Sequence, residues 1–303
     1  MKYCVQYYKD FRYNDIIDEI IYTYNDNIVN DITNAGWKDT QRIIVDVFAE
    51  EDSDTILPIL QMCKKVHSNI VICLGTWQIN LTQKLKEIDY PFFFLNMANT
   101  NDEVYALIKK GASDVYITES LAFNIINVGT YCRNKGINVR IIPNIAQYKA
   151  GYKDEIEDPY KFFVRPEDVE LYEPYADVFE IKAPTDKLSI IYEIYRNKQW
   201  TGDLGRLITG FSEPFYNSGL VPYFGPERLK CGQRCMQEKC NLCQQMKELA
   251  AKFKDNDLIL KRAKDKEWKN ETESYQKAMQ FVKEAAPSDN DEVSEEQGVS
   301  EDN

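Results

Sequence analysis

Histidine is almost absent from this sequence of 303 residues, in which His67 is the only one. Ser/His/Asp and Cys/His catalysis, multi-histidine zinc sites and the two-histidine, one-carboxylate iron site all need imidazole in the site. A single histidine therefore argues strongly against these classes. We expect His67 itself to be a surface residue near the end of a helix.

The sequence also lacks a long apolar run, and its mean hydropathy is -0.50. This excludes a membrane-spanning helix, whereas 44% apolar residues are enough for a packed core. Met1 is followed by the strand-like segment Lys2–Tyr8 instead of a basic leader with an apolar stretch. We therefore expect a soluble, cytoplasmic protein with reduced cysteines.

The charge is acidic and unevenly distributed. The net charge is -12, and residues 286–303 carry seven acidic and no basic side chains, so subtracting -7 leaves -5 for the rest. This balance argues against broad nucleic-acid binding and leaves room for a local basic face.

Short β-branched or aromatic segments alternate along the chain with longer amphipathic ones. The predicted strands are Lys2–Tyr8, Arg42–Phe48, Asn69–Gly75, Pro91–Asn96, Asp114–Thr118, Asn138–Ile145, Lys161–Arg165 and Asp177–Lys182. The predicted helices are Tyr13–Asn25, Asp54–His67, Leu81–Ile88, Asn101–Lys110, Ser120–Lys135 and Thr185–Asn197. We expect N-caps at Asp54 and Asn101 and helix stops at Gly111 and Gly136.

Eight strands in this order predict a parallel sheet closed into a (β/α)8 TIM-like barrel. The sequence contains neither the Gly-rich dinucleotide fingerprint nor a P-loop, which argues against a doubly wound nucleotide-binding sheet. The connections 147–160 and 166–175 are short for full helices, which leaves an irregular or incomplete barrel as the alternative. Pro143 lies inside a predicted strand and is expected to distort it.

We divide the chain into four parts. Residues 1–200 form the barrel, 201–245 a loop extension that packs on it and carries a cysteine cluster, 246–285 a charged helical segment and 286–303 an acidic disordered tail. The helix expected over Leu258–Glu284 is a candidate contact for a protein partner.

Four of the eight cysteines fall within thirteen residues, Cys231, Cys235, Cys240 and Cys243, in a C-x3-C-x4-C-x2-C arrangement. Four thiolates this close repel one another unless a cation neutralises them, so we expect a metal site. The short central gap favours an iron-sulfur cluster, with 4Fe-4S first, over structural zinc, which usually joins two separated cysteine pairs. The other four cysteines lie singly in apolar patterns, where a thiol packs as a small hydrophobe.

Three segments carry a resemblance to a known family: Gly111–Ile117 (GASDVYI), Gly136–Asn144 (GINVRIIPN) and Val164–Asp168 (VRPED). Together with the cysteines, they make residues 1–245 resemble the peptidase U32 family. That resemblance implies an iron-sulfur protein built on a barrel, which supports oxygen-independent or prephenate-dependent hydroxylation of tRNA, ribosomal RNA or quinone precursors. This chain departs from the family in two respects: it lacks the Gly-Ser-x-Cys-containing signature, and it gathers its cysteines in one run.

Barrel enzymes place their chemistry at the C-terminal ends of the strands. The polar residues predicted there are Tyr7, Asp46, Asn96, Glu119, Asn144, Gln147, Arg165 and Glu180. Arg165 is a candidate grip for a carboxylate or phosphate, and Asp46, Glu119 or Glu180 a candidate acid or base. Asn96 and Asn144 can hold an amide or a sugar hydroxyl. The structural alternative to these functional roles is that Arg165 forms an ion pair with Glu180 or Asp46 across the barrel mouth.

Three functions compete. The first is a U32-like iron-sulfur barrel that supports hydroxylation or another modification of RNA or of a small carboxylate or aromatic substrate. The second is a non-catalytic binding or scaffold barrel with structural zinc. The third, a peptidase, has the least support, because the sequence has no serine elbow and no HExxH motif.

Overall fold

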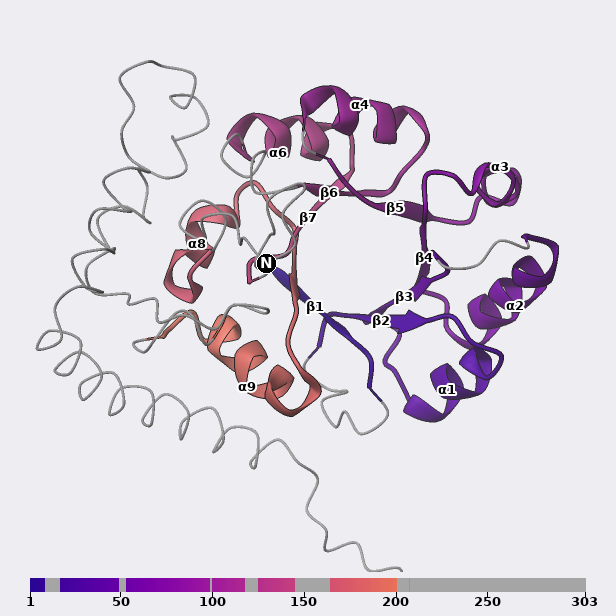
Figure 1. The fold of residues 1–303 in the computed structure, drawn as a ribbon, viewed down its shortest axis with the longest axis horizontal. Coiled ribbons are helices and arrows are strands. Elements are labelled where there is room, and N and C mark those ends of the chain that lie inside the picture. Colours follow the sequence, from indigo (N-terminus) through magenta and orange to yellow (C-terminus); the bar gives the residue numbers. More distant parts are fainter. Residues whose placement is uncertain are drawn as a thin grey trace, which may run out of the picture.

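The computed structural model describes residues 1–8, 17–48, 53–98, 100–117, 125–144, 164–200 and 207. They form a closed barrel of eight parallel strands, in which β1 pairs with both β2 and β8 (Figure 1). The strands are β1 (Lys2–Gln6), β2 (Glu19–Thr23), β3 (Arg42–Asp46), β4 (Ile70–Leu74), β5 (Phe92–Ala98), β6 (Asp114–Ile117), β7 (Asn138–Ile141) and β8 (Val178–Ile181). The predicted (β/α)8 architecture is confirmed.

Helices surround this barrel and bury their apolar faces against the outside of the strands (Figure 1). They are α1 (Ile28–Ala35), α2 (Ser53–Val66), α3 (Ile79–Glu87), α4 (Asn101–Lys109), α6 (Ile125–Asn134), the short 3-10 turn η1 (Pro166–Asp168), α8 (Val169–Tyr172) and α9 (Thr185–Arg196). None of the helices in the described part of the chain is long and apolar enough to cross a membrane.

The second strand corrects the sequence prediction. Residues 13–25 were expected to form a helix because Ile16, Ile17, Ile20 and Ile21 recur at helical spacing. Instead Glu19–Thr23 is β2, and the helix that follows it, α1, was not predicted. The run Ile20-Ile21-Tyr22 is β-branched and aromatic, and it is buried between the barrel interior and the helical layer, where a strand fits better than a helix.

The predicted strand Lys161–Arg165 is wrong in its described part. Val164 and Arg165 lie outside any strand, and Arg165 immediately precedes η1. The Val164 amide donates to the Pro143 carbonyl at 3.0 Å, just beyond the end of β7. Pro143 therefore lies after its strand instead of inside it, and β7 needs no distortion to accommodate it.

Helix ends agree in part with the sequence. Gly111 and Gly136 follow α4 and α6 with φ of 90° and 69°, as the predicted glycine stops require. The N-cap of α4 is Thr100 instead of Asn101, since the Thr100 hydroxyl accepts from the Glu103 amide at 3.3 Å. Asp54 is the second residue of α2 and not its cap.

An ionic network fills the N-terminal end of the barrel, where strands begin. Arg42 donates to both oxygens of Asp114, at 2.6 and 2.7 Å. Arg140 donates to Glu19 at 2.6 Å and to Asp114 at 3.1 Å. All four side chains are buried, and two positive charges balance two negative ones. This network fills the barrel interior at the end where the strands begin.

Asp114 makes the network sensitive to acid. Burial opposes ionisation, but the hydrogen bonds and charge of Arg42 outweigh it and lower the pKa of Asp114 to about 2, against an ordinary 3.8. Because the folded-state pKa lies below the unfolded one, the stabilisation is complete above pH 3.8 and is lost as pH falls towards 2.

We predict that Asp114→Asn lowers the free energy of unfolding at pH 7 by about 3 kcal/mol, because two buried arginines are left with Glu19 as their one carboxylate partner in the network. From pH 4 to pH 2, the variant should lose about 2 kcal/mol less stability than the parent protein. Urea unfolding at several pH values measures both effects. The exposed Asp39→Asn is the control and should follow the parent protein. Parallel pH profiles for Asp114→Asn and the parent would contradict the account.

Candidate active site at the barrel mouth

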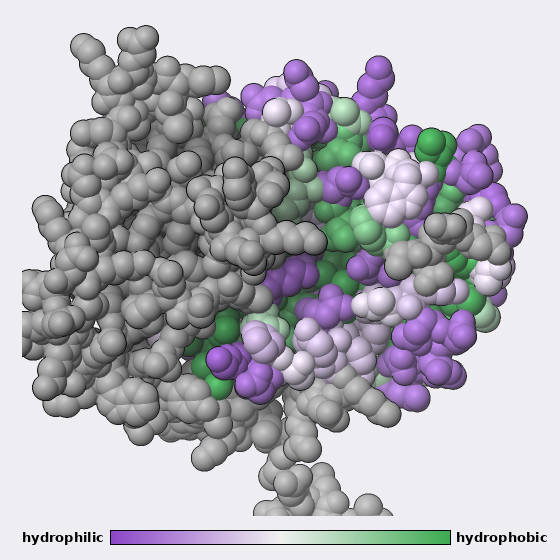
Figure 2. Space-filling view, viewed as in Figure 1, coloured by the Kyte–Doolittle hydropathy of each residue, from purple (hydrophilic) through white to green (hydrophobic). Residues whose placement is uncertain are grey.

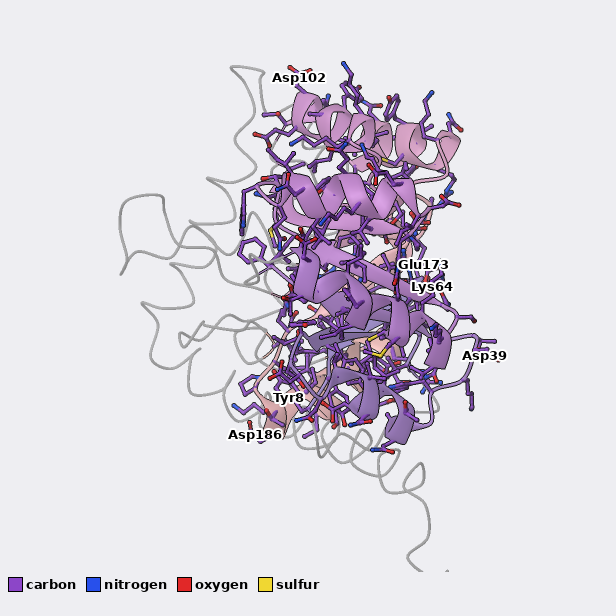
Figure 3. The ribbon with its side chains drawn as sticks, turned by 90° about the vertical axis from the view of Figure 1, so that its right-hand side faces the viewer. Tyr8, Asp39, Lys64, Asp102, Glu173 and Asp186 are labelled. Carbon is purple, nitrogen blue, oxygen red and sulfur yellow. The ribbon has the colours of Figure 1, made fainter. Side chains whose placement is uncertain are left out.

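The C-terminal ends of the strands lie together at one end of the barrel, which we call the mouth. Figure 3 shows Tyr8, just after β1, with Asp102 and Asp186, which begin α4 and α9, toward this end. Asp39, Lys64 and Glu173 lie at the opposite end. Figure 2 shows hydrophilic and hydrophobic side chains side by side on the described part of one face.

Three side chains meet inside the barrel below the mouth. Glu180 on β8 forms an ion pair with Lys182, which directly follows that strand. The Tyr116 hydroxyl on β6 donates to the other oxygen of Glu180. Residues 180 and 182 share one face because strand side chains alternate. Glu180 and Tyr116 are each 1% exposed, whereas the Lys182 side chain is 32% exposed and reaches towards solvent.

The electrostatics of this group keep the ion pair charged. Burial acts to raise the pKa of Glu180, but Lys182 and Arg140 hold it below its ordinary value. Burial acts to lower the pKa of Lys182, and Glu180 more than offsets this, so it lies above its ordinary value. Near neutral pH the mouth therefore presents an ammonium group that is fixed by a buried carboxylate.

Asp46 ends β3 and is the acid-base candidate at the mouth. Its carboxylate accepts from the Phe48 amide at 2.9 Å and is half-buried. Burial raises the pKa of Asp46, although the charge of Lys182 partly offsets this effect. A carboxyl group with a raised pKa is better suited than an ordinary aspartate to give or take a proton near neutral pH.

The thiols of Cys4 and Cys73 are buried, and burial raises the pKa of both well above the usual value. Cys63 and Cys132 are buried in α2 and α6, with the pKa of each raised to about 11 by burial. Such thiols stay protonated and are poor nucleophiles. Their burial agrees with the packing role expected from the sequence.

The other predicted site residues lie in different settings. The Asn144 amide donates to the carbonyls of Lys182, at 2.6 Å, and Leu207, at 3.0 Å, and its oxygen accepts from the Lys182 amide at 3.1 Å. Asn144 therefore positions the backbone that carries Lys182. Asn96 is exposed and accepts from the Thr76 amide at 3.2 Å.

Arg165 and Tyr7 have partners of their own. Asp168 binds the Arg165 guanidinium with both oxygens, at 2.8 and 2.7 Å. Tyr7 stacks on Tyr22 with ring centroids 4.2 Å apart. Glu119 and Gln147 lie outside the described residues, as do Cys231, Cys235, Cys240 and Cys243. The predicted parts 201–245, 246–285 and 286–303 lie outside them too, apart from Leu207.

Sequence reasoning missed Lys182 and Tyr116. The available signal was the segment Val178–Lys182 (VFEIK), in which two charged residues are spaced by two on an otherwise apolar strand. Such a pattern predicts that both charges point into the barrel, where each needs a partner. Tyr116 gives no comparable signal, because only the closed barrel brings β6 opposite β8.

His67 corrects a further expectation. It is 4% exposed instead of lying on the surface, and its Nε2 is 2.9 Å from the Gln41 carbonyl. Both residues lie just before strands, at the end of the barrel opposite the mouth. The one imidazole of the chain is therefore remote from the mouth cluster. Within the described ranges, no group of three or more His, Cys, Asp and Glu side chains is arranged to hold a metal ion.

Comparison of the sequence with known proteins finds a partial match to an archaeal protein. No family model matches the sequence. The chain is 30% identical over 152 residues, 46% of its length, to an uncharacterized protease of Methanocaldococcus jannaschii. This likeness agrees loosely with the U32 resemblance. The match spans 40% of the length of that archaeal protein, so its activity does not transfer directly.

The ion pair at the mouth generates a direct prediction. Lys182→Met should raise the pKa of Glu180, because it removes the nearest positive charge from a buried carboxylate. Carbon-13 NMR titration of the glutamate carboxyls measures this, with Glu180→Gln to assign the signal. Lys64→Met, at the opposite end of the barrel, should leave the Glu180 titration unchanged. An unchanged Glu180 titration in Lys182→Met would show that the pair is not formed.

Proposed function

We propose that the chain is a U32-like barrel enzyme that supports hydroxylation or a related modification of a substrate bound at the mouth. The observation that carries this proposal is the cluster of Glu180, Lys182 and Tyr116 beside Asp46, which lies at the catalytic end of the barrel. A partly exposed ammonium group and a carboxyl group of raised pKa at this end of a barrel are typical of functional sites.

The cofactor in this proposal is an iron-sulfur cluster held by Cys231, Cys235, Cys240 and Cys243. The donor set fits such a cluster, because four cysteines within thirteen residues supply the four thiolates that it needs. When bound, the cluster supplies one-electron redox chemistry. Cys4, Cys63, Cys73 and Cys132 are each buried as free thiols. In this proposal the cluster ligands are therefore the four cysteines of the C-terminal run.

The residues of the mouth have separate roles in this proposal. Lys182 binds an anionic group of the substrate, and Glu180 and Asn144 hold it in place. Asp46 gives or takes a proton at the substrate. Tyr116 satisfies the second oxygen of Glu180 and so fixes the carboxylate below the ammonium group. Candidate substrates are RNA and small carboxylate or aromatic molecules.

Peptidase activity is the weaker candidate despite the name of the archaeal relative. The one histidine is buried at the wrong end of the barrel and contacts a backbone carbonyl. Among the described residues, the mouth offers no cysteine with a lowered pKa, since the pKa values of Cys4 and Cys73 are both raised. A structural zinc on the four-cysteine run, in a binding protein, is the second candidate that the donor set supports.

Anaerobic purification of the full chain, followed by absorption spectroscopy and analysis for iron, sulfide and zinc, tests the proposal. We expect a brown protein that contains iron and sulfide, because four thiolates favour a cluster. Cys231→Ser and Cys240→Ser should both lose iron. Cys63→Ser is the matched control and should keep it. A colourless protein with one zinc per chain would contradict the redox proposal and favour the binding protein.

A further inference from the structure

Four polar side chains lie next to one another on consecutive strands at the mouth. In order across β8, β1, β2 and β3, they are Lys182, Gln6, Thr23 and Asp46. Thr23 and Asp46 are direct partners in the sheet, and the Gln6 amide donates to the Thr23 hydroxyl at 3.1 Å. Lys182 continues the register in which Val5 pairs with Ile181, so it lies beside Gln6. These pairings join the four residues into one polar surface, which we call the mouth wall.

The mouth wall faces the interior of the barrel, because side chains alternate along a strand. Thr23 and Asp46 lie four residues beyond Glu19 and Arg42, which form an ion pair inside the barrel. Gln6 faces the same way, since its amide reaches the Thr23 hydroxyl. Thr23 is exposed, and Gln6 and Asp46 are half-buried, so a ligand that enters the mouth can reach all three.

The mouth wall has hydrogen-bonding capacity that the described residues do not use. The Gln6 amide oxygen, the Thr23 hydroxyl proton and one oxygen of Asp46 have no hydrogen-bond partner within the described part of the chain. Amide and carboxylate oxygens accept from hydroxyl groups, and the threonine hydroxyl can donate to them. These groups therefore match a ligand that carries several hydroxyl groups.

Lys182 supplies a positive charge at one end of the mouth wall. Its side chain is 32% exposed and is held by Glu180. An ammonium group has three donors, so it can keep Glu180 and bind an anionic group of a ligand at the same time. Asp102 and Asp186, exposed in the first turns of α4 and α9, lie toward the mouth and repel the repeated phosphates of a nucleic acid. The charges therefore favour a small ligand with one anionic group.

An aromatic or aliphatic ligand fits the mouth wall poorly. Tyr7, the aromatic residue next to Gln6, points to the other face of β1 and stacks on Tyr22. An apolar ring placed against the mouth wall would remove water from its polar groups without replacing the hydrogen bonds. A ligand with hydroxyl groups replaces them.

We infer that the mouth wall binds a sugar acid, whose carboxylate pairs with Lys182 and whose hydroxyl groups bind the other three side chains. This inference rests on the proposed function, because it takes the mouth as the substrate site. It names the substrate class and assigns Gln6 and Thr23 as specificity residues. Sequence reasoning missed both. Thr23 falls in the segment expected to be a helix, and Tyr7 was expected at the strand end in place of Gln6.

Ligand-observed NMR with the full chain tests the substrate class. The probes are gluconate, galactonate and mannonate, which are sugar acids that differ in configuration. Hexanoate keeps the carboxylate and loses the hydroxyl groups, and sorbitol keeps the hydroxyl groups and loses the carboxylate. We expect at least one sugar acid to bind about tenfold more tightly than both. Equal binding of hexanoate, tighter binding of benzoate or no binding of any sugar acid would overturn the inference.

Two variants test the residues of the mouth wall. Gln6→Leu and Thr23→Val should each weaken binding of that sugar acid about fivefold, because each removes hydrogen-bonding groups and nearly keeps the size of the side chain. Gln83→Leu on α3 and Thr33→Val on α1 are the matched controls, on exposed helix positions outside the barrel, and should bind as the parent does. Urea unfolding checks that each variant is folded. Unchanged binding in either Gln6→Leu or Thr23→Val would overturn the inference.

The same preparations separate this inference from the proposed chemistry. Iron analysis of each variant should give the parent value, because neither Gln6 nor Thr23 belongs to the cysteine run. If the protein contains zinc and no iron but sugar-acid binding still requires Gln6 and Thr23, the redox proposal fails and the binding site stands. If iron is present and binding does not depend on these residues, the binding site fails and the redox proposal stands.

Discussion

The buried guanidinium of Arg140 is the interaction on which the barrel depends. It lies on β7 and reaches Glu19 on β2 and Asp114 on β6, so one side chain ties together strands from different sides of the barrel. Its planar group also lies over the rings of Phe93 and Tyr116, at 5.0 and 5.3 Å. The cation-π contacts help to offset the cost of burying a charge, which apolar packing alone does not.

The positive charge of Arg140 acts at both ends of the barrel. Below Arg140, the network with Arg42, Glu19 and Asp114 is buried and balanced in charge, as expected of the end of the barrel that provides stability. Above it, Arg140 helps Lys182 to keep Glu180 ionised. Lys182 is the larger influence that keeps Glu180 ionised and Arg140 the second, so the stabilising network contributes to the electrostatics of the mouth.

The sequence predicted the architecture better than its details. Alternating strand and helix patterns gave the barrel, because parallel strands buried on both faces are apolar throughout. The helical spacing of isoleucines in 13–25 concealed β2, since local periodicity does not report burial on both sides. Asp46, Asn144 and Glu180 are found at or near the mouth, because strand ends can be read from the sequence. Tyr116 was not expected there, because its role depends on a contact between β6 and β8, which are distant in the chain. Lys182 was overlooked, although its partner Glu180 lies two residues before it.

In the proposed function, the iron-sulfur cluster and the residues of the mouth serve one site. The most direct test is a crystal structure of the anaerobically purified full chain, with anomalous scattering measured at the iron edge. The account predicts iron bound by Cys231, Cys235, Cys240 and Cys243 on the mouth side of the barrel, facing Lys182 and Asp46. Iron or zinc at the opposite end, near His67 and the Arg42 network, would contradict it.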